Sequence, residues 1–127
     1  RALNIFPDDL MNDLKSFGLF FEDFAVRDLV IYASCIGGEV RHYRDGTGLE
    51  CDAIVRLPDG QWGAIEIKLG GEELINDGVK SLLTLKKKLN EKSDEPAPAF
   101  MMILTACGSL YHRPDGIYVV PINCLKP

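Results

Sequence analysis

The sequence has little basic charge. Its 14 Lys and Arg residues stand against 19 Asp and Glu residues, which gives a formal net charge of −5. A domain-wide basic surface for nucleic acid is therefore excluded, so any contact with DNA or RNA needs a local patch or a metal ion. No apolar run approaches the ~20 residues that span a bilayer. The longest, from Ala97 to Ala106, has the length of a buried strand, and we expect no membrane partner.

The cysteines and histidines are too few and too scattered for a zinc ribbon or a serine or cysteine triad. Cys35, Cys51, Cys107 and Cys124 form no CxxC pair, and no histidine stands near them at ligand spacing. A chain of 127 residues with 46% hydrophobic residues needs no disulfide, so we expect four free, buried thiols in a reducing cytoplasm. His42 lies on an expected strand and is a secondary site candidate, although a structural or surface role is the more common one.

The chain also lacks a starting Met, a signal pattern, internal repeats and a G-x-x-x-x-G-K-[ST] phosphate loop. It begins with Arg1, and we expect a fragment of a longer protein. Its length suits one domain. We expect residues 1–16 to be a lead-in segment with a short helical pattern at Leu10, Met11 and Leu14, and residues 17–127 to form the domain.

Hydrophobic periodicity predicts an α/β domain with a mixed sheet flanked by helices. The expected order is α-β-β-β-α-β-β: a helix at 17–36, strands at 39–44, 49–57 and 61–69, a helix at 72–92, and strands at 100–104 and 116–120.

The two helices have apolar faces that we expect to cover the sheet. On the second helix a lysine-rich side points outward; it could contact a phosphate backbone, but a solvated face explains it equally well. On the first helix Glu22 falls inside the apolar arc, where a carboxylate is costly unless something binds it. The expected inner residues are Leu19, Ala25, Val26, Leu29, Val30, Ala33 and Ile36 on the first helix, and Leu74, Ile75, Val79, Leu82, Leu85 and Leu89 on the second; the outer lysines are Lys80, Lys86, Lys87, Lys88 and Lys92.

Four charged side chains are expected on one face of the second and third strands. A three-residue turn at 58–60 places Asp52 opposite Glu66 and Glu50 opposite Lys68. The other face is apolar, with Cys51, Ala53, Val55, Leu57, Ile65 and Ile67.

Two carboxylates directly opposite each other repel unless a cation lies between them or one is protonated. Oxygen ligands at this spacing suit Mg²⁺ or Mn²⁺. We expect Asp52, Glu66 and the Ile67 carbonyl to hold the ion, with Glu22 as a further ligand or supporting carboxylate. Lys68 would orient an attacking water or stabilise charge on a phosphoryl group. Glu50 is a secondary candidate, because Glu50 with Lys68 is also an ordinary cross-strand ion pair.

This arrangement resembles the PD-(D/E)xK nuclease superfamily, whose restriction-endonuclease-like fold the predicted elements match. In the resemblance Asp52 is the motif Asp, Glu66 and Lys68 are the second acid and the lysine, and Glu22 is the acid of the first helix. The residue before Asp52 is Cys51, so the Pro of the motif is missing.

A closer resemblance covers nearly the whole chain. The segments FGLFFE at 17–22, HYRD at 42–45, GLECD at 48–52, GAIEIKLG at 63–70 and DGIYVVP at 115–121 are similar to the uncharacterised C-terminal domain of prokaryotic AAA-type ATPases. The resemblance implies an upstream ATP-binding domain, and a metal-dependent nuclease-like domain acting on DNA. The alternative is a catalytically silent module that docks DNA or protein for that ATPase, which the acidic balance favours.

Overall fold

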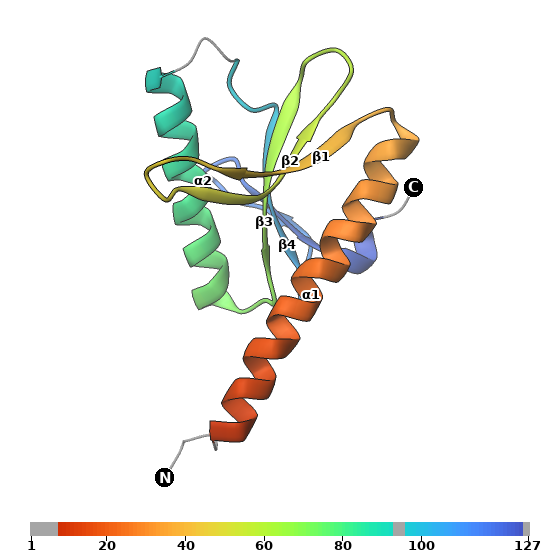
Figure 1. The fold of residues 1–127 in the computed structure, drawn as a ribbon, viewed down its shortest axis with the longest axis vertical. Helices are drawn as coiled ribbons and strands as arrows, with labels where there is room; N and C mark the ends of the chain where they lie inside the picture. Colours follow the sequence, from red (N-terminus) through yellow and green to blue (C-terminus); the bar gives the residue numbers. More distant parts are fainter. Residues whose placement is uncertain (1–7, 93–95, 126–127) are drawn as a thin grey trace.

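The computed structural model describes residues 8–92 and 96–125, which form two α-helices and a six-stranded sheet (Figure 1). The mixed α/β class is therefore confirmed. The elements are α1 (Asp8–Cys35), β1 (Glu39–Arg44), β2 (Glu50–Arg56), β3 (Trp62–Lys68), α2 (Glu72–Lys92), β4 (Phe100–Thr105), β5 (Tyr111–His112), β6 (Tyr118–Pro121) and a closing 3-10 turn (Ile122–Cys124).

The sheet is a mixed one, with strand order β1-β2-β3-β4-β6-β5. β1, β2 and β3 form an antiparallel meander, whereas β4 runs parallel to both β3 and β6. The parallel step from β3 to β4 requires a crossover, which α2 supplies. α1 and α2 lie on opposite sides of the sheet (Figure 1). β3 is consequently buried on both faces, and only its last residue, Lys68, is partly exposed.

α1 is one continuous helix, whereas a separate helix beginning at residue 17 was expected. Gly18 does not end it, because a glycine inside a helix costs only about 1 kcal/mol. The side chains of Leu10, Met11 and Leu14 lie outside the described residues. The buried residues of α1 follow a narrow stripe at every fourth position: Phe21, Ala25, Leu29 and Ala33.

The apolar arc expected on α1 is therefore only partly right. Leu19 is 67% exposed, and Val30 and Ile36 are also exposed. On α2 the expected inner face is confirmed for Ile75, Val79, Leu82 and Leu85, while Leu74 is 39% exposed. A helix laid on a twisted sheet contacts it along a stripe, so residues at the edge of a broad arc stay outside the core.

The hairpin between β2 and β3 has the predicted register. The Leu57 N–H donates to the Gln61 carbonyl at 2.8 Å, and Ala53 pairs with Ile65. Gly60 adopts the left-handed conformation (φ 90°) that lets three residues close the turn.

Two expectations away from the site are corrected. β5, which pairs antiparallel with β6, was not expected, because two residues carry no readable periodicity. All four cysteines are free, but only Cys51 is buried; Cys35, Cys107 and Cys124 are exposed. Neither α1 nor α2, over the residues described, has a stretch long and apolar enough to cross a bilayer.

Gly63 of β3 makes room for an aromatic ring of the neighbouring strand. A Cβ at this position would lie 2.2 Å from the Phe100 ring, so Gly63→Ala must displace that ring from its packing against the α1-side core. We expect the free energy of unfolding to fall by about 1–3 kcal/mol in urea titration. Gly46→Ala is the matched control, since no atom lies within 4 Å of its added methyl; equal effects of the two substitutions would contradict this account.

Candidate functional site

The candidate site lies where β2 and β3 separate. Backbone pairing between the two strands ends at Ala53 and Ile65. Beyond this pair, hydrogen bonds between backbone N–H groups and carboxylate side chains connect the strands. The Ile67 N–H donates to Asp52 Oδ2 at 2.8 Å, and the Asp52 N–H donates to Glu66 Oε2 at 2.9 Å. One oxygen of each carboxylate is thus held by a backbone N–H across the gap between the strands, and the Asp52 carboxyl group is also within hydrogen-bond reach of the Glu22 and Glu66 side chains.

An irregularity between β1 and β2 sets the direction of Asp52. Arg41 pairs with Ile54 and Tyr43 pairs with Cys51, so the single residue His42 faces both Asp52 and Ala53. Such a bulge changes the direction of side chains and is common beside active sites.

The bulge also changes the face of Cys51, which joins the core on the α2 side and not, as expected, the apolar face on the α1 side. Burial raises the pKa of this thiol to about 12, so it is not a nucleophile near neutral pH.

Glu22 of α1 completes a group of three neighbouring carboxyl groups. The pKa of Glu66, a side chain only 6% exposed, is raised to about 7, first by burial and then by the charge of Asp52. The pKa of Glu22 is raised by the same two causes in the same order, and His42 opposes the shift. The ionised Asp52 carboxylate therefore repels both Glu22 and Glu66.

The Ile67 carbonyl and Lys68 lie beside these carboxyl groups. In a strand the N–H and C=O of one residue point to the same side, so the Ile67 carbonyl faces Asp52 as its N–H does. Lys68 and Glu66 lie on the same face of β3, both beside Gly78 of α2, and the positive charge of Lys68 lowers the pKa of Glu66.

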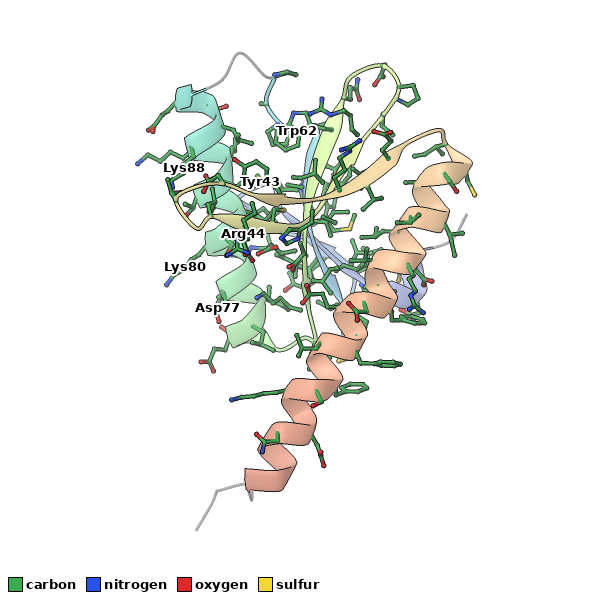
Figure 2. The ribbon with its side chains drawn as sticks, viewed as in Figure 1. Tyr43, Arg44, Trp62, Asp77, Lys80 and Lys88 are labelled. Atoms are coloured by element: carbon green, nitrogen blue, oxygen red, sulfur yellow. The ribbon has the colours of Figure 1, made fainter. Side chains whose placement is uncertain are left out.

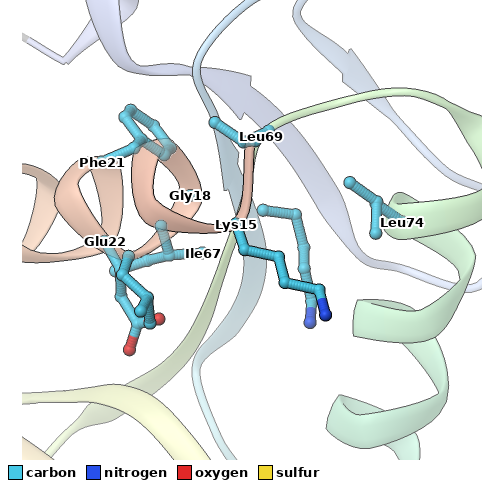
Figure 3. Close-up of a pocket in the computed structure, with 9 residues that line it drawn as sticks. Lys15, Gly18, Phe21, Glu22, Ile67, Leu69 and Leu74 are labelled. Carbon is cyan, nitrogen blue, oxygen red and sulfur yellow. The ribbon is translucent and has the colours of Figure 1, made fainter. Parts of the chain in front are cut away.

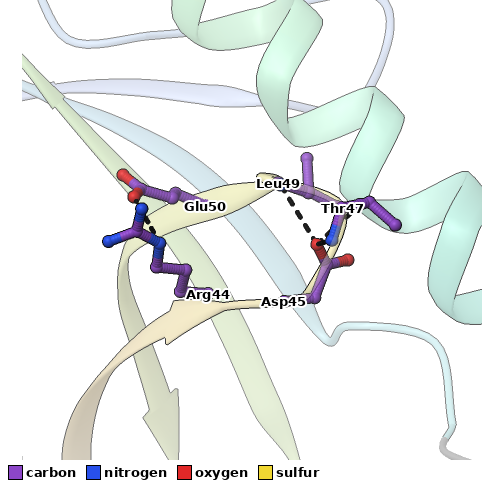
Figure 4. Close-up of polar contacts among 5 residues, drawn as sticks. All are labelled: Arg44, Asp45, Thr47, Leu49 and Glu50. Atoms are coloured by element: carbon purple, nitrogen blue, oxygen red, sulfur yellow. Dashed lines mark hydrogen bonds and ion pairs between the residues drawn. The ribbon is translucent and has the colours of Figure 1, made fainter.

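Glu50 is not part of this group, contrary to the prediction that it lies opposite Lys68. It pairs with Arg44 on β1, where it forms an exposed ion pair with 3.2 Å between Nε and Oε1 (Figure 4). The strands β2 and β3 have separated before Glu50, so the predicted register does not extend to it. The adjacent turn is closed by Asp45, which accepts hydrogen bonds from Thr47 and Leu49 (Figure 4).

Two cavities lie beside this site, and Glu22 lines both. The first, of about 420 Å³, is mainly polar and includes His42, Asp52 and Arg27. The second, of about 630 Å³, lies between the first half of α1, the end of β3 and the start of α2, and includes Lys15 and Lys68 (Figure 3). Lys15 and Arg27 were missed at the sequence level, although Lys15 stands seven residues before Glu22 and so shares its face of the helix.

The lysines of α2 lie away from the site. Lys80 points outward from the outer side of the helix, and Lys88 donates to Thr47 Oγ1 at 2.8 Å at the turn between β1 and β2 (Figure 2). Lys86 and Lys87 are exposed, and the side chain of Lys92 lies outside the described residues. A solvated face therefore describes most of this run, with Lys88 as the exception.

The donor set fits a hard divalent cation of the kind predicted. Carboxylate and carbonyl oxygens are the ligands that Mg²⁺ and Mn²⁺ prefer, and Asp52, Glu66 and Ile67 present them at the fork. Within residues 8–92 and 96–125 no three His, Cys, Asp or Glu side chains already stand in a metal-ligand arrangement. The expected set accordingly depends on two carboxylates and one backbone carbonyl, with Glu22 beside them.

Comparison with protein families gives one finding that covers most of the chain. A family model described as a domain of unknown function, DUF4143, matches residues 17–125. No curated protein and no solved structure matches. The matched range includes every predicted site residue, and of the residues lining the two cavities it leaves out only Lys15.

Proposed function

The chain belongs to the DUF4143 family, and we propose that it is a divalent-metal-dependent phosphodiesterase acting on DNA, with a core of the PD-(D/E)xK type. The observation that carries the proposal is the pair of hydrogen bonds between β2 and β3 in which the Asp52 N–H donates to Glu66 and the Ile67 N–H donates to Asp52. They hold the buried carboxyl group of Glu66 against Asp52, which lines the polar cavity, and burying a carboxyl group beside a second one is unfavourable for a purely structural role.

In this proposal Asp52, Glu66 and the Ile67 carbonyl hold Mg²⁺ or Mn²⁺, and Glu22 assists. The bound ion would supply Lewis-acid stabilisation of charge on the phosphoryl oxygens. The Lys68 ammonium, beside Glu66, orients the attacking water and stabilises the same charge. Water adds to phosphorus and the bond to one ester oxygen breaks; the water's proton ends on the leaving oxygen, so the products are a phosphomonoester and an alcohol.

Hydrolysis of plasmid DNA and of a single-stranded oligonucleotide tests the proposal. We expect cleavage in Mn²⁺ and none in EDTA. Lys68→Gln should lower the rate by about 10²–10³-fold, the range found when one donor to a developing oxyanion is removed. Its affinity for Mn²⁺, measured by isothermal titration, should stay close to that of the wild-type chain, because Lys68 is not a ligand. Absence of Mn²⁺ binding to the wild-type chain would refute the proposal.

The second candidate function is a catalytically silent docking module for an ATPase domain of the same protein. It is supported by an apolar stripe on the outer side of α1, where Phe17, Phe20, Phe24 and Ile31 are each about half exposed or more. Monomeric proteins rarely expose such a patch without a binding role. Under this function Asp52→Ala with Glu66→Ala leaves the role of the parent protein intact, whereas loss of that role in a folded double variant would exclude it.

A further inference from the structure

The larger cavity next to the carboxyl groups has an aliphatic wall. Leu19 of α1, Leu69 after β3 and Leu74 of α2 line it, and Figure 3 shows Leu69 and Leu74 on separate elements around the same space. Leu19 and Leu74 were expected in the core, yet both are exposed to this cavity. The cavity volume is about 630 Å³, within the range of pockets that hold small organic ligands.

Two cations stand at this aliphatic wall. Lys15 and Lys68 both line the cavity, and in the view of Figure 3 the Lys15 side chain lies between Glu22 and Leu74. Across the described part of the chain, neither lysine forms a hydrogen bond or an ion pair. The charge of Lys68 acts on Glu66, whereas Lys15 is available to an anion and belongs to no step of the proposed hydrolysis.

The helix itself connects this cavity to the carboxyl groups. Positions i, i+4 and i+7 share one face of a helix, and Lys15, Leu19 and Glu22 occupy these positions on α1. A ligand that touches Leu19 therefore has a cation on one side and the carboxyl groups on the other. A cation followed by an apolar surface suits a ligand in which anionic groups alternate with flat apolar groups along an extended chain.

We propose that this cavity binds one unpaired nucleotide of a single-stranded DNA, next to the phosphodiester that is cut. Its base lies against Leu19, Leu69 and Leu74, and its far phosphate contacts Lys15. Bases stack on apolar side chains only when they are released from a duplex, so the cavity selects single strands or unpaired ends. The inference rests on the proposed function for the position of the cut, but base and phosphate binding can be measured without cleavage.

The test uses the Asp52→Asn chain, so that hydrolysis does not disturb binding, and measures fluorescence anisotropy with a labelled single-stranded oligonucleotide and its duplex. We expect at least 5-fold tighter binding to the single strand. Lys15→Gln should weaken single-strand binding about 5- to 10-fold and reduce the slope of log K against log salt by about 0.7, the value for one phosphate contact. Lys87→Gln is the matched control, since this exposed lysine lies about 20 Å farther along α2 than Leu74.

A second variant fills the cavity without changing the charge. Gly18 lines it, and an added Cβ would make ordinary contact, 3.6 Å from Leu69 Cδ1. Gly18→Leu should therefore remove the preference for the single strand, whereas Gly18→Ala should keep it and control for the loss of glycine. Equal affinity for both DNA forms, or equal effects of Lys15→Gln and Lys87→Gln, would overturn the inference.

The two proposals fail in different ways. If the wild-type chain cleaves DNA in a metal-dependent way but the Lys15 and Gly18 variants bind single strands normally, the phosphodiesterase proposal stands and the nucleotide-cavity proposal is refuted. Selective single-strand binding by the Asp52→Asn chain, with no cleavage by the wild-type chain in Mn²⁺, retains the cavity and removes the hydrolytic function.

Discussion

Asp52→Asn is expected to lower metal-dependent DNA hydrolysis by at least about 100-fold and to weaken Mn²⁺ binding in parallel. The charge that would bind the proposed cation is lost, while the asparagine oxygen can still accept the hydrogen bond that the Ile67 N–H donates to Asp52 Oδ2. The fold should consequently survive, and the free energy of unfolding without metal should not fall. Initial cleavage rates at several Mn²⁺ concentrations separate the loss of affinity from the loss of rate.

Glu50→Gln is the matched control for that experiment. It removes a carboxylate from the same strand, two residues away, whose partner is Arg44 and not the site. The exposed ion pair contributes about 1 kcal/mol or less to stability, so cleavage should remain within 2-fold of the wild-type rate. A similar loss of rate in both variants would show that the activity depends on the overall negative charge of this region and not on the position of Asp52.

The stability of the metal-free chain is expected to decrease between about pH 5 and pH 8. The pKa of Glu66 is raised from 4.5 to about 7 by burial and by Asp52, so the folded state holds a proton that the unfolded state releases. Stability from this group is complete below the unfolded pKa and is lost as pH rises through the folded pKa. The expected loss is up to about 3 kcal/mol, and the raised pKa of Glu22 acts in the same direction.

Urea denaturation at several pH values, in EDTA, measures this loss. The difference between wild type and Glu66→Gln isolates it, because Gln keeps an acceptor for the Asp52 N–H but cannot ionise. Asp45 does not interfere: hydrogen bonds from Thr47 lower its pKa, so its own contribution is lost only in more acidic solution. A wild-type profile that is flat or rises from pH 5 to pH 8 relative to Glu66→Gln would contradict the proposed repulsion.

The same repulsion predicts the effect of metal. Mg²⁺ should restore stability at pH 8, where the carboxyl groups are ionised, and should have little effect at pH 5, where protons already neutralise them. With a Kd of about 1 mM, 10 mM Mg²⁺ would add about 1.4 kcal/mol. Equal stabilisation of wild type and Asp52→Asn would place the ion elsewhere on the surface.

The sequence by itself determined the class of fold and the register of the hairpin. Strand periodicity of two residues and a three-residue turn predict the pairing from Ala53 with Ile65 to Arg56 with Trp62, and this register brings Asp52 near Glu66 just beyond the last backbone pair. Helical periodicity placed Glu22 at the edge of the face that α1 turns to the sheet, where it is half-buried beside Asp52. Lys68 followed from alternation along β3.

Only the tertiary structure decided what surrounds that pair. The bulge opposite His42 turns Cys51 toward α2. Because β2 and β3 separate before Glu50, Glu50 forms its ion pair with Arg44 of β1. Neither event has a signal in local periodicity, because each depends on how three strands twist against one another. Likewise, helical periodicity defines an apolar arc on α1 but not how much of it the sheet covers. That coverage left Leu19 exposed beside Lys15, and it created the cavity to which we assign the nucleotide.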